Sequence, residues 1–162
     1  ARQQGFKPKV ITLGKALLFP GAIEALGDLG YGLTSEVWWS PSHPFTSSLT
    51  KQSAKALAEA YEAGAKKQWT QPIGFAHALF EVAADALKRA DVRDAVAQSN
   101  LNTVVGPVKW GGAGPFKNVS KTPLVLGQWV KAPAGSKNKV ELVIVNNETA
   151  KNIPTGGSLK TI

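Results

Sequence analysis

Two adjacent tryptophans, Trp38 and Trp39, constrain the fold more than any other feature of this sequence. They lie in residues 35–45, which read SEVWWSPSHPF. Neighbouring side chains of a β-strand point to opposite faces, so both indoles cannot enter the same core. Pro41 and Pro44 then restrict the backbone and remove two hydrogen-bond donors. The sequence therefore predicts that one indole lies outside the core that receives the other, and that a stiff segment follows.

The residues before this pair alternate between strand and helix patterns. Residues 9–13, KVITL, are β-branched and apolar and predict a buried strand. Residues 21–30, GAIEALGDLG, predict a helix with Pro20 in its first turn. A second strand is expected over residues 33–39. Alternating strands and helices are typical of an α/β layered fold.

Helices and then strands are expected after the prolines. Residues 49–64 predict an amphipathic helix, and residues 71–90 a helix with apolar residues around most of its circumference. We therefore expect the second of these helices to be largely buried. Asp91 is a favourable N-cap for a further short helix. Beyond it, strands separated by turns are expected over three segments, 103–110, 123–131 and 139–147, and an irregular tail over 153–162.

Composition excludes several classes of protein. Of the 162 residues, 43% are apolar and 19% charged, which is typical of a globular chain, and cysteine is absent. No apolar run approaches the roughly 20 residues that a membrane span needs. The net charge is +8, but the lysines are scattered and only three arginines occur. A DNA-binding face needs clustered arginines to read base edges, so we expect no nucleic-acid partner.

Catalytic and metal-binding patterns are weak. The only histidines are His43 and His77, and no Gly-x-Ser-x-Gly motif accompanies Ser40 or Ser42. Two histidines without a nearby acid at ligand spacing make a poor metal site. The glycines of residues 111–115 lack the strand–loop–helix context of a phosphate-binding loop. The sequence thus predicts no catalytic residue, no metal and no cofactor; an enzyme that uses the two histidines is the less favoured alternative.

The aromatic side chains are more informative, because many of them fall at expected element ends and in loops. They are Phe19, Trp38, Trp39, Phe45 and Phe75. With Lys15, which shares a loop with Phe19, they could form a small apolar pocket that contains one cation. Such a pocket suits an aromatic or branched carboxylate. The alternatives are a packing role for each ring and a solvated surface position for the lysine.

The first residues resemble the end of a helix. ARQQGFKP reads as a last helical turn, with Gly5 at the C-terminal cap and Pro8 just beyond it. We expect that further residues precede Ala1 and that the chain is a fragment.

Five segments in this order carry a resemblance to a known family. They are ARQQGFKPKVIT, GKALLFPGAIEALGDLGYGLTSEVWWSPSHPF, YEAGAKKQWTQPIGFAHALFEVAADALKRA, NTVVGPVKW and GQWVK. Together they resemble the C-terminal half of the solute-binding proteins of branched-chain amino acid type ABC transporters. The similarity covers nearly the whole chain and is closest to the branch that takes aromatic or related carboxylates.

The resemblance implies an α/β fold of the type I periplasmic-binding-protein kind, with three-layer α/β/α lobes built on parallel-type sheets. The chain would be a C-terminal fragment of a two-lobed protein that holds its ligand in the cleft between the lobes. Residues 1–40 would belong to the C-terminal lobe, and residues 41–104 would form a crossing segment and helices mainly of the N-terminal lobe. Residues 105–162 would return through the hinge and supply the remaining strands and the tail. One indole of the pair would then pack inside its lobe while the other faces the cleft or the hinge.

The resemblance also implies a binding site. In amino-acid-binding members, an acid in the loop after the first strand pairs with the ligand's ammonium group. The same loop reads TLGKALLF here, with Gly14 or Lys15 near that position, so a ligand without an amine is expected. His77 falls near a position where members often carry tyrosine; it could bind the ligand or be a satisfied buried histidine. The predicted ligand-binding residues are Lys15, Phe19, Trp38, Trp39 and His77.

The function implied is a periplasmic receptor, made with a signal peptide that is later removed, which delivers a small carboxylate to an ABC transporter permease. Its partners would be the ligand, the permease and the missing N-terminal lobe of the same protein. The alternative is a ligand-sensing domain of a signalling receptor on the same fold.

Overall fold

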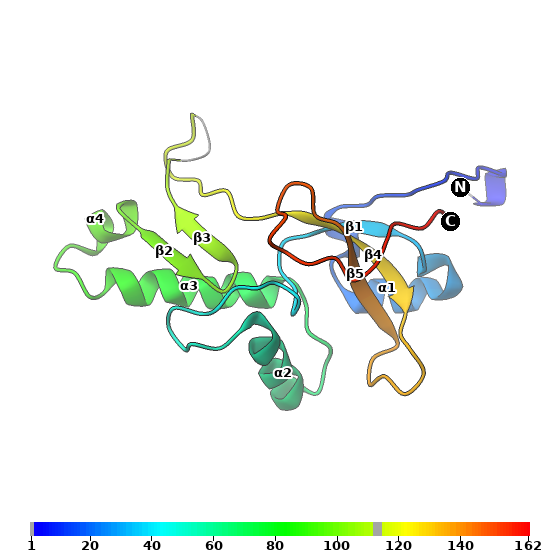
Figure 1. Cartoon of the computed structure of the whole chain (residues 1–162), viewed down its shortest axis with the longest axis horizontal. Helices are drawn as coiled ribbons and strands as arrows, with labels where there is room; N and C mark the ends of the chain where they lie inside the picture. Colours follow the sequence, from blue (N-terminus) through cyan, green and yellow to red (C-terminus); the bar gives the residue numbers. More distant parts are fainter. Residues whose placement is uncertain (1, 112–114) are drawn as a thin grey trace. The chain divides into compact units, whose positions relative to one another are not determined.

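The computed structural model describes residues 2–111 and 115–162, and its backbone contacts form two compact units. Unit 1 comprises Ala1–Val37 and Val125–Ile162, and unit 2 comprises Trp38–Leu124 (Figure 1). The chain thus leaves unit 1 after Val37, within the segment 33–39 that we expected to form a strand. Residues 105–111 and 115–124, which we expected in the returning segment, belong to unit 2. The assignment of these segments to the lobes of a complete protein stays a prediction.

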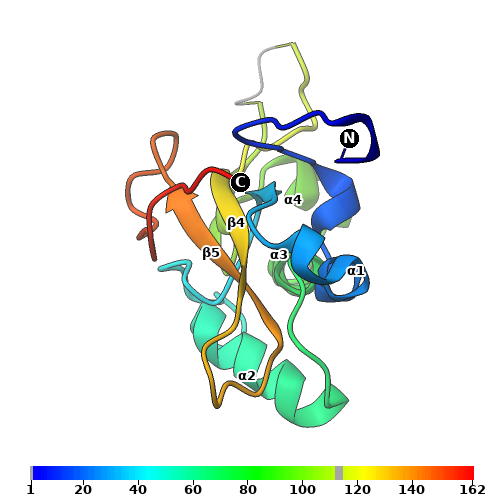
Figure 2. The same cartoon turned by 90° about the vertical axis from the view of Figure 1, so that its right-hand side faces the viewer.

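Unit 1 is built on a three-stranded antiparallel sheet with the order β1-β4-β5. Its strands are β1 (Thr34–Val37), β4 (Val125–Lys131) and β5 (Val140–Asn146). Helix α1 (Pro20–Leu26) begins at Pro20, as predicted, and packs on β5 (Figure 2). Alternate residues of β5 are buried, which is the pattern of a strand with one face on a core.

The parallel-type sheet implied by the resemblance is not found among the strands of unit 1. The expected strand 9–13 contributes only an isolated parallel bridge between Thr12 and Thr34. Parallel neighbours require a long crossover connection, whereas β4 and β5 are joined by the short segment 132–139 and therefore pair antiparallel. The single bridge is still held firmly, because Thr34 accepts from the backbone of Leu13 and donates to Ile11, each at 2.9 Å.

Three short 3₁₀ turns complete the helical segments of unit 1: η1 (Arg2–Gln4), η2 (Lys15–Leu17) and η3 (Gly27–Gly30). Gly5 follows η1 with a φ of 70°, a left-handed conformation that favours glycine, as expected for a residue that ends a helical turn. None of the described helices has both the length and the apolar character needed to cross a membrane.

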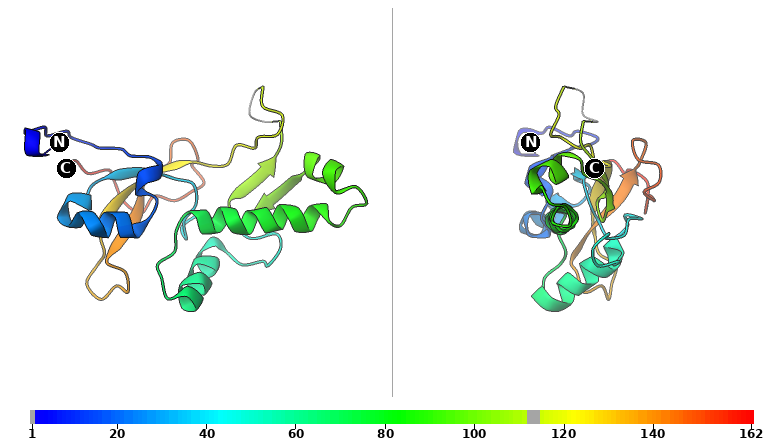
Figure 3. Two further views of the ribbon diagram at one scale, coloured as in Figure 1. Left: turned by 180° about the vertical axis from the view of Figure 1, so that it is seen from behind. Right: turned by 90° about the vertical axis from the view of Figure 1, so that its left-hand side faces the viewer.

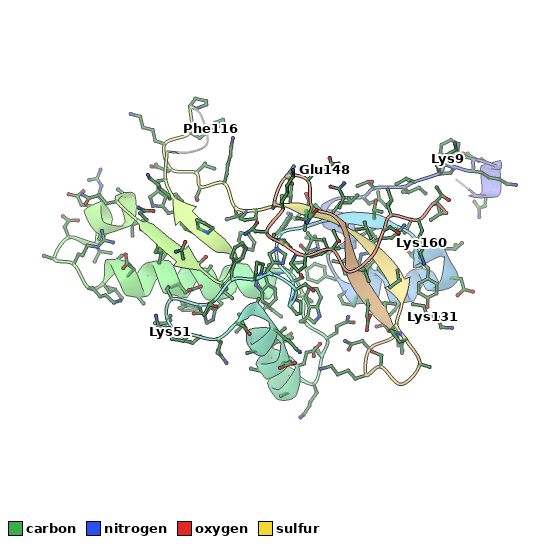
Figure 4. The ribbon with its side chains drawn as sticks, viewed as in Figure 1. Lys9, Lys51, Phe116, Lys131, Glu148 and Lys160 are labelled. Carbon is green, nitrogen blue, oxygen red and sulfur yellow. The ribbon has the colours of Figure 1, made fainter. Side chains whose placement is uncertain are left out.

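The C-terminal tail has no helix or strand, as predicted, but it is fixed in place. The buried Gln128 side chain donates to the carbonyl of Lys160 at 2.7 Å and accepts from its backbone N–H at 3.0 Å. Ile162 in turn donates its backbone N–H to the carbonyl of Lys9. Figure 4 labels Lys9 and Lys160. The side-chain amide of Gln128 thus bonds the backbone of the tail in the way that a neighbouring strand would.

Unit 2 combines three helices with one antiparallel hairpin. The helices are α2 (Ala54–Ala65), α3 (Pro72–Ala86) and α4 (Val92–Ala97). The hairpin pairs β2 (Asn100–Thr103) with β3 (Gly106–Lys109), and α3 runs beside it (Figure 3). The core consists of Trp39, Ala54, Ala58, Ala78, Val104 and Val105. Asp91 caps α4 as predicted, by accepting from the N–H of Asp94 at 3.0 Å.

Helix α3 is not largely buried, contrary to the expectation from its apolar composition. Leu79, Phe80 and Leu87 are 67%, 65% and 71% exposed. The helix buries one face, which includes Ala78 and Glu81, within unit 2. The sequence pattern predicted the helix correctly, but the prediction that it is largely buried is wrong for this structure.

Candidate functional site

Lys15 and Phe19 lie on an anchored loop of unit 1, between the Thr12 bridge and α1. The loop contains η2, whose Leu17 is buried and accepts a 2.9 Å hydrogen bond at its carbonyl from the indole of Trp129. Lys15 and Phe19 themselves are exposed. The fold thus presents a cation and an aromatic ring on a loop that is held in place by the hydrogen bond from Trp129.

A carboxylate lies beside this loop although the loop itself contains no acid. An added Cβ on Gly14 would stand 3.4 Å from Oε1 of Glu36, the half-buried acid in the middle of β1. Ser35 also reaches the loop, since its hydroxyl donates to the carbonyl of Gly14 at 3.4 Å. Glu36 is 22 positions from Gly14 along the chain, so its proximity could not be predicted from the sequence. The charge near Lys15 is therefore mixed rather than purely positive.

Trp38 is a half-buried indole held from two directions in unit 2. Its ring meets Phe75 edge to face, with ring centres 6.0 Å apart and planes at 78°. Its backbone N–H donates to the side-chain oxygen of the buried Gln71 at 2.7 Å. Part of the ring surface stays accessible, so Trp38 can offer an aromatic face of fixed orientation.

Trp39 occupies the opposite environment and is 0% exposed. It meets Trp69 edge to face at 6.0 Å and lies so close to Gly74 that a Cβ there would come within 2.3 Å of the indole. The expectation that the two indoles separate is confirmed: Trp39 enters the core of unit 2 and Trp38 does not. Because Trp39 is fully buried in this structure, it has no exposed surface with which to contact a ligand directly.

His77 is half-buried on α3 and is engaged by Ser47, whose hydroxyl lies 2.8 Å from Nε2. That hydroxyl oxygen also accepts the backbone N–H groups of Leu49 and Thr50. Because both lone pairs are used, we assign the single hydroxyl proton to the contact with His77 Nε2. This arrangement matches the satisfied-histidine alternative, and its role towards a ligand stays a prediction.

Ser40 and His43 form a buried hydrogen-bonded pair in the proline segment. The Ser40 hydroxyl lies 3.0 Å from His43 Nδ1, and both residues are buried. Burial lowers the pKa of His43 from its ordinary 6.5 to about 4. The other ring nitrogen, Nε2, has no partner among the described residues, so no acid orients the ring as a triad requires. The pair serves to fix the proline segment.

A buried carboxylate on α3, Glu81, is an organising group that sequence analysis overlooked. Its Oε1 accepts from the backbone and the hydroxyl of Ser48, and its Oε2 accepts from the backbone N–H of Val104 at 3.0 Å. Three donors replace the water that a buried carboxylate loses. The signal in the sequence was weak, because Glu81 is one of two acids, with Asp85, within an otherwise apolar helix. Glu81 ties the loop before α2 and the hairpin to α3.

The predicted ligand contacts are thus divided between the units, with two in unit 1 and three in unit 2. A cavity of about 650 Å³ lies elsewhere in unit 1, between Phe6, Leu29, Tyr31 and the tail residue Ile162, and includes none of them. Within the described part of the chain, no group of three or more His, Cys, Asp or Glu side chains could hold a metal ion.

Comparison with protein-family models finds no match, and comparison with curated protein sequences finds none either. Solved structures do match. The chain is similar to a leucine-binding protein from Thermotoga maritima, with a TM-score of 0.63 and 22% identity over 91% of this chain and 40% of that one. The chain has part of the fold of a type I periplasmic binding protein.

Two further structures agree. A leucine-, isoleucine-, valine-, threonine- and alanine-binding protein from Brucella ovis has a TM-score of 0.67 and 15% identity, over 99% of this chain and 41% of that one. The branched-chain amino acid transporter substrate-binding protein of Streptococcus pneumoniae has a TM-score of 0.62 and 15% identity, over 89% and 39%. The predicted fold class is confirmed, and the chain spans about 40% of the length of the structures it matches.

Proposed function

We propose that this chain is part of the periplasmic solute-binding receptor of an ABC importer, which captures a small aromatic or branched carboxylate and delivers it to a permease. The observation that carries the proposal is the similarity to branched-chain amino acid binding proteins over 89% to 99% of the chain. The remainder of the protein, including the N-terminal lobe, would complete the receptor.

The carboxylate of the ligand would pair with Lys15. Its ammonium group is exposed on an anchored loop, and no ion pair of Lys15 is found within residues 2–111 and 115–162. A cation without a protein partner can exchange water for a ligand anion at low cost. The exposed ring of Phe19 lies on the same loop and would contact the apolar part of the ligand.

The aromatic character of the ligand is supported by Trp38. Its indole is held by Phe75 and by the Gln71 hydrogen bond, so little side-chain freedom would be lost when a ligand ring packs on it. A branched aliphatic ligand would make the same apolar contact with Trp38 but would lack the additional favourable interaction between two aromatic rings.

An α-amino acid is the second candidate ligand, and Glu36 is the observation that favours it. This carboxylate lies beside Gly14, next to the position where amino-acid-binding members of the resembling family carry an acid. The two candidates differ in which charge dominates: Lys15 disfavours a ligand amine, whereas Glu36 would pair with one.

The test is calorimetric titration of the protein produced from its complete reading frame, with pairs of ligands that differ only by the amine. L-leucine is compared with 4-methylpentanoate, and L-phenylalanine with 3-phenylpropanoate. We expect the amine-free acid of each pair to bind at least about ten times more tightly, a difference of about 1.4 kcal/mol. Tighter binding of the amino acids would favour Glu36 over Lys15. Binding of neither pair would overturn the receptor proposal for this class of ligand.

A further inference from the structure

The connection between β3 and β4 contains a surface segment that is rich in lysine and free of acids. From residue 95 to residue 140 the sequence has six lysines and no aspartate, glutamate or arginine. Three of these lysines, Lys109, Lys117 and Lys121, belong to unit 2. All three are exposed, and no ion pair involves them within residues 2–111 and 115–162. We call Lys109 and residues 115–121 the basic loop.

The basic loop also exposes two apolar side chains. Phe116 is 63% and Val119 45% exposed, and Figure 4 shows Phe116 beyond the end of β3, on the side away from α3. A single exposed apolar residue is ordinary, so the combination with unpaired lysines is the informative feature. The turn between β4 and β5 also carries lysines, but its Lys139 pairs with Glu24 at 3.3 Å and it contains no aromatic residue.

The base of the basic loop is fixed to the rest of unit 2. The hydroxyl of Ser120 accepts the backbone N–H of Lys109 at 3.1 Å and so joins the end of β3 to the returning chain. The indole N–H of Trp110 donates to the carbonyl of Val96 in α4. The two acids of α4 lie at its N-cap and in its first turn. The structure thus holds the loop at its base and presents the Phe116 ring and the lysines to solvent.

We propose that the basic loop is a contact surface for anionic lipid headgroups at a membrane surface. The ring of Phe116 would enter the headgroup region, and the three lysines would lie beside lipid phosphates. Binding of this kind draws on buried apolar area and on attraction between basic side chains and anionic lipids. With one ring and three cations the contact would be weak and reversible, and it would hold the protein near the membrane without a spanning segment. This inference goes beyond the proposed function and does not depend on the ligand.

An acidic protein surface is the competing occupant, and the type of cation opposes it. Protein–protein interfaces are enriched in arginine, whose planar group fits carboxylates in a fixed geometry, and depleted in lysine. The basic loop has lysines and no arginine. A lysine ammonium group is a point charge on a flexible stem, which suits a fluid layer of phosphates better than a fixed set of carboxylates.

Vesicle sedimentation tests the proposal with the protein from the complete reading frame. Vesicles of equal parts phosphatidylglycerol and phosphatidylcholine are compared with vesicles of phosphatidylcholine alone, at low and high ionic strength. Phe116→Ala removes the ring, and its control is Phe6→Ala, because Phe6 is also 63% exposed. Lys117→Gln with Lys121→Gln removes two charges from the loop. Its control, Lys131→Gln with Lys151→Gln, removes two exposed charges from unit 1.

We expect the wild type to bind the anionic vesicles at least about ten times more strongly than the neutral ones, and less strongly at high ionic strength. The loop double variant should weaken that binding at least about tenfold and Phe116→Ala about fivefold or more, whereas both controls should bind as the wild type does. Equal binding to the two kinds of vesicle, or wild-type binding by the loop variants, would overturn the proposal.

Poly-L-glutamate serves as the probe for the competing occupant. If the protein ignores both kinds of vesicle but binds poly-L-glutamate, and only the loop double variant loses that binding, the loop is assigned to an acidic protein surface and the lipid proposal is wrong. Vesicle binding is measured without any small carboxylate. A negative result here therefore leaves the proposed receptor function untouched, and failure of the ligand titrations leaves this test untouched.

Discussion

The close approach of Trp39 to Gly74 leads to a prediction opposite to the usual effect of replacing a helical glycine. In a helix interior, Gly→Ala normally stabilises by about 0.5–1 kcal/mol, because alanine loses less backbone entropy on folding. At Gly74, however, the new methyl carbon would lie 2.3 Å from Cγ and 2.4 Å from Cδ2 of the indole. Carbon atoms pack at about 3.5–4.0 Å, so the ring would have to retreat by more than about 1 Å.

Trp39 has no room for this movement, because it is fully buried and its edge contacts Trp69. Overpacking of a filled core costs about 1–3 kcal/mol, which exceeds the gain in helix propensity. We expect Gly74→Ala to destabilise unit 2 by about 1–2 kcal/mol. Gly64→Ala is the matched control: Gly64 lies in α2 with nothing within 4 Å of an added Cβ, and its replacement should stabilise by about 0.5 kcal/mol.

The assay is urea unfolding followed by tryptophan fluorescence. Four of the five tryptophans, at 38, 39, 69 and 110, belong to unit 2, so the signal reports mainly on that unit even if the two units unfold separately. The reasoning is refuted if Gly74→Ala raises the unfolding free energy as much as Gly64→Ala does. That result would mean that the indole does not rest on the backbone of α3.

Three further predictions concern unit 2. Lys66 ends α2 in a left-handed conformation, with a φ of 55°, so Lys66→Gly should raise the unfolding midpoint in urea by an amount equivalent to about 0.5–1 kcal/mol, and a decrease would contradict this. Burial lowers the pKa of His43 from 6.5 to about 4, so between these pH values the unfolded state binds a proton that the folded state does not. The unfolding free energy of unit 2 should therefore fall by about 3 kcal/mol as the pH is lowered from 6.5 to 4. His43→Gln should lack this part of the pH dependence when its unfolding curves are compared with those of the wild type. Glu81→Gln should lower the thermal midpoint of unit 2, at a cost of about 1–3 kcal/mol, because an amide cannot accept from all three donors. The exposed Glu59→Gln is the control and should change the midpoint little. Equal effects of the two substitutions would show that Glu81 does not link the loop before α2 and the hairpin to α3.

Local signals in the sequence predicted much of the secondary structure. Pro20 begins α1, Asp91 caps α4, and the two indoles of Trp38 and Trp39 separate as predicted, although both residues lie just beyond β1. Each of these features depends on a residue and its near neighbours along the chain, which is the information that a single sequence carries.

Features that depend on distant parts of the chain were missed. The segment 9–13 was expected to form a full strand, but it finds only one partner position at Thr34, which sequence periodicity cannot show. Glu36 approaches Gly14 near that same pairing, and Leu79, Phe80 and Leu87 of the apolar α3 segment are exposed. The order of motifs predicted the fold class, whereas the charges near Lys15 required the three-dimensional arrangement.

The central claim is that Lys15 supplies the cation that holds a ligand carboxylate. It is tested most directly by titrating 4-methylpentanoate and 3-phenylpropanoate into the complete protein and into its Lys15→Gln and Lys55→Gln variants. A hydrogen bond to a charged group contributes about 1.5–3 kcal/mol, so Lys15→Gln should weaken the tighter of the two ligands by roughly 10- to 100-fold. Lys55→Gln removes another exposed charge, on α2, and should leave the affinity unchanged. Equal affinities for the wild type and Lys15→Gln would contradict the account.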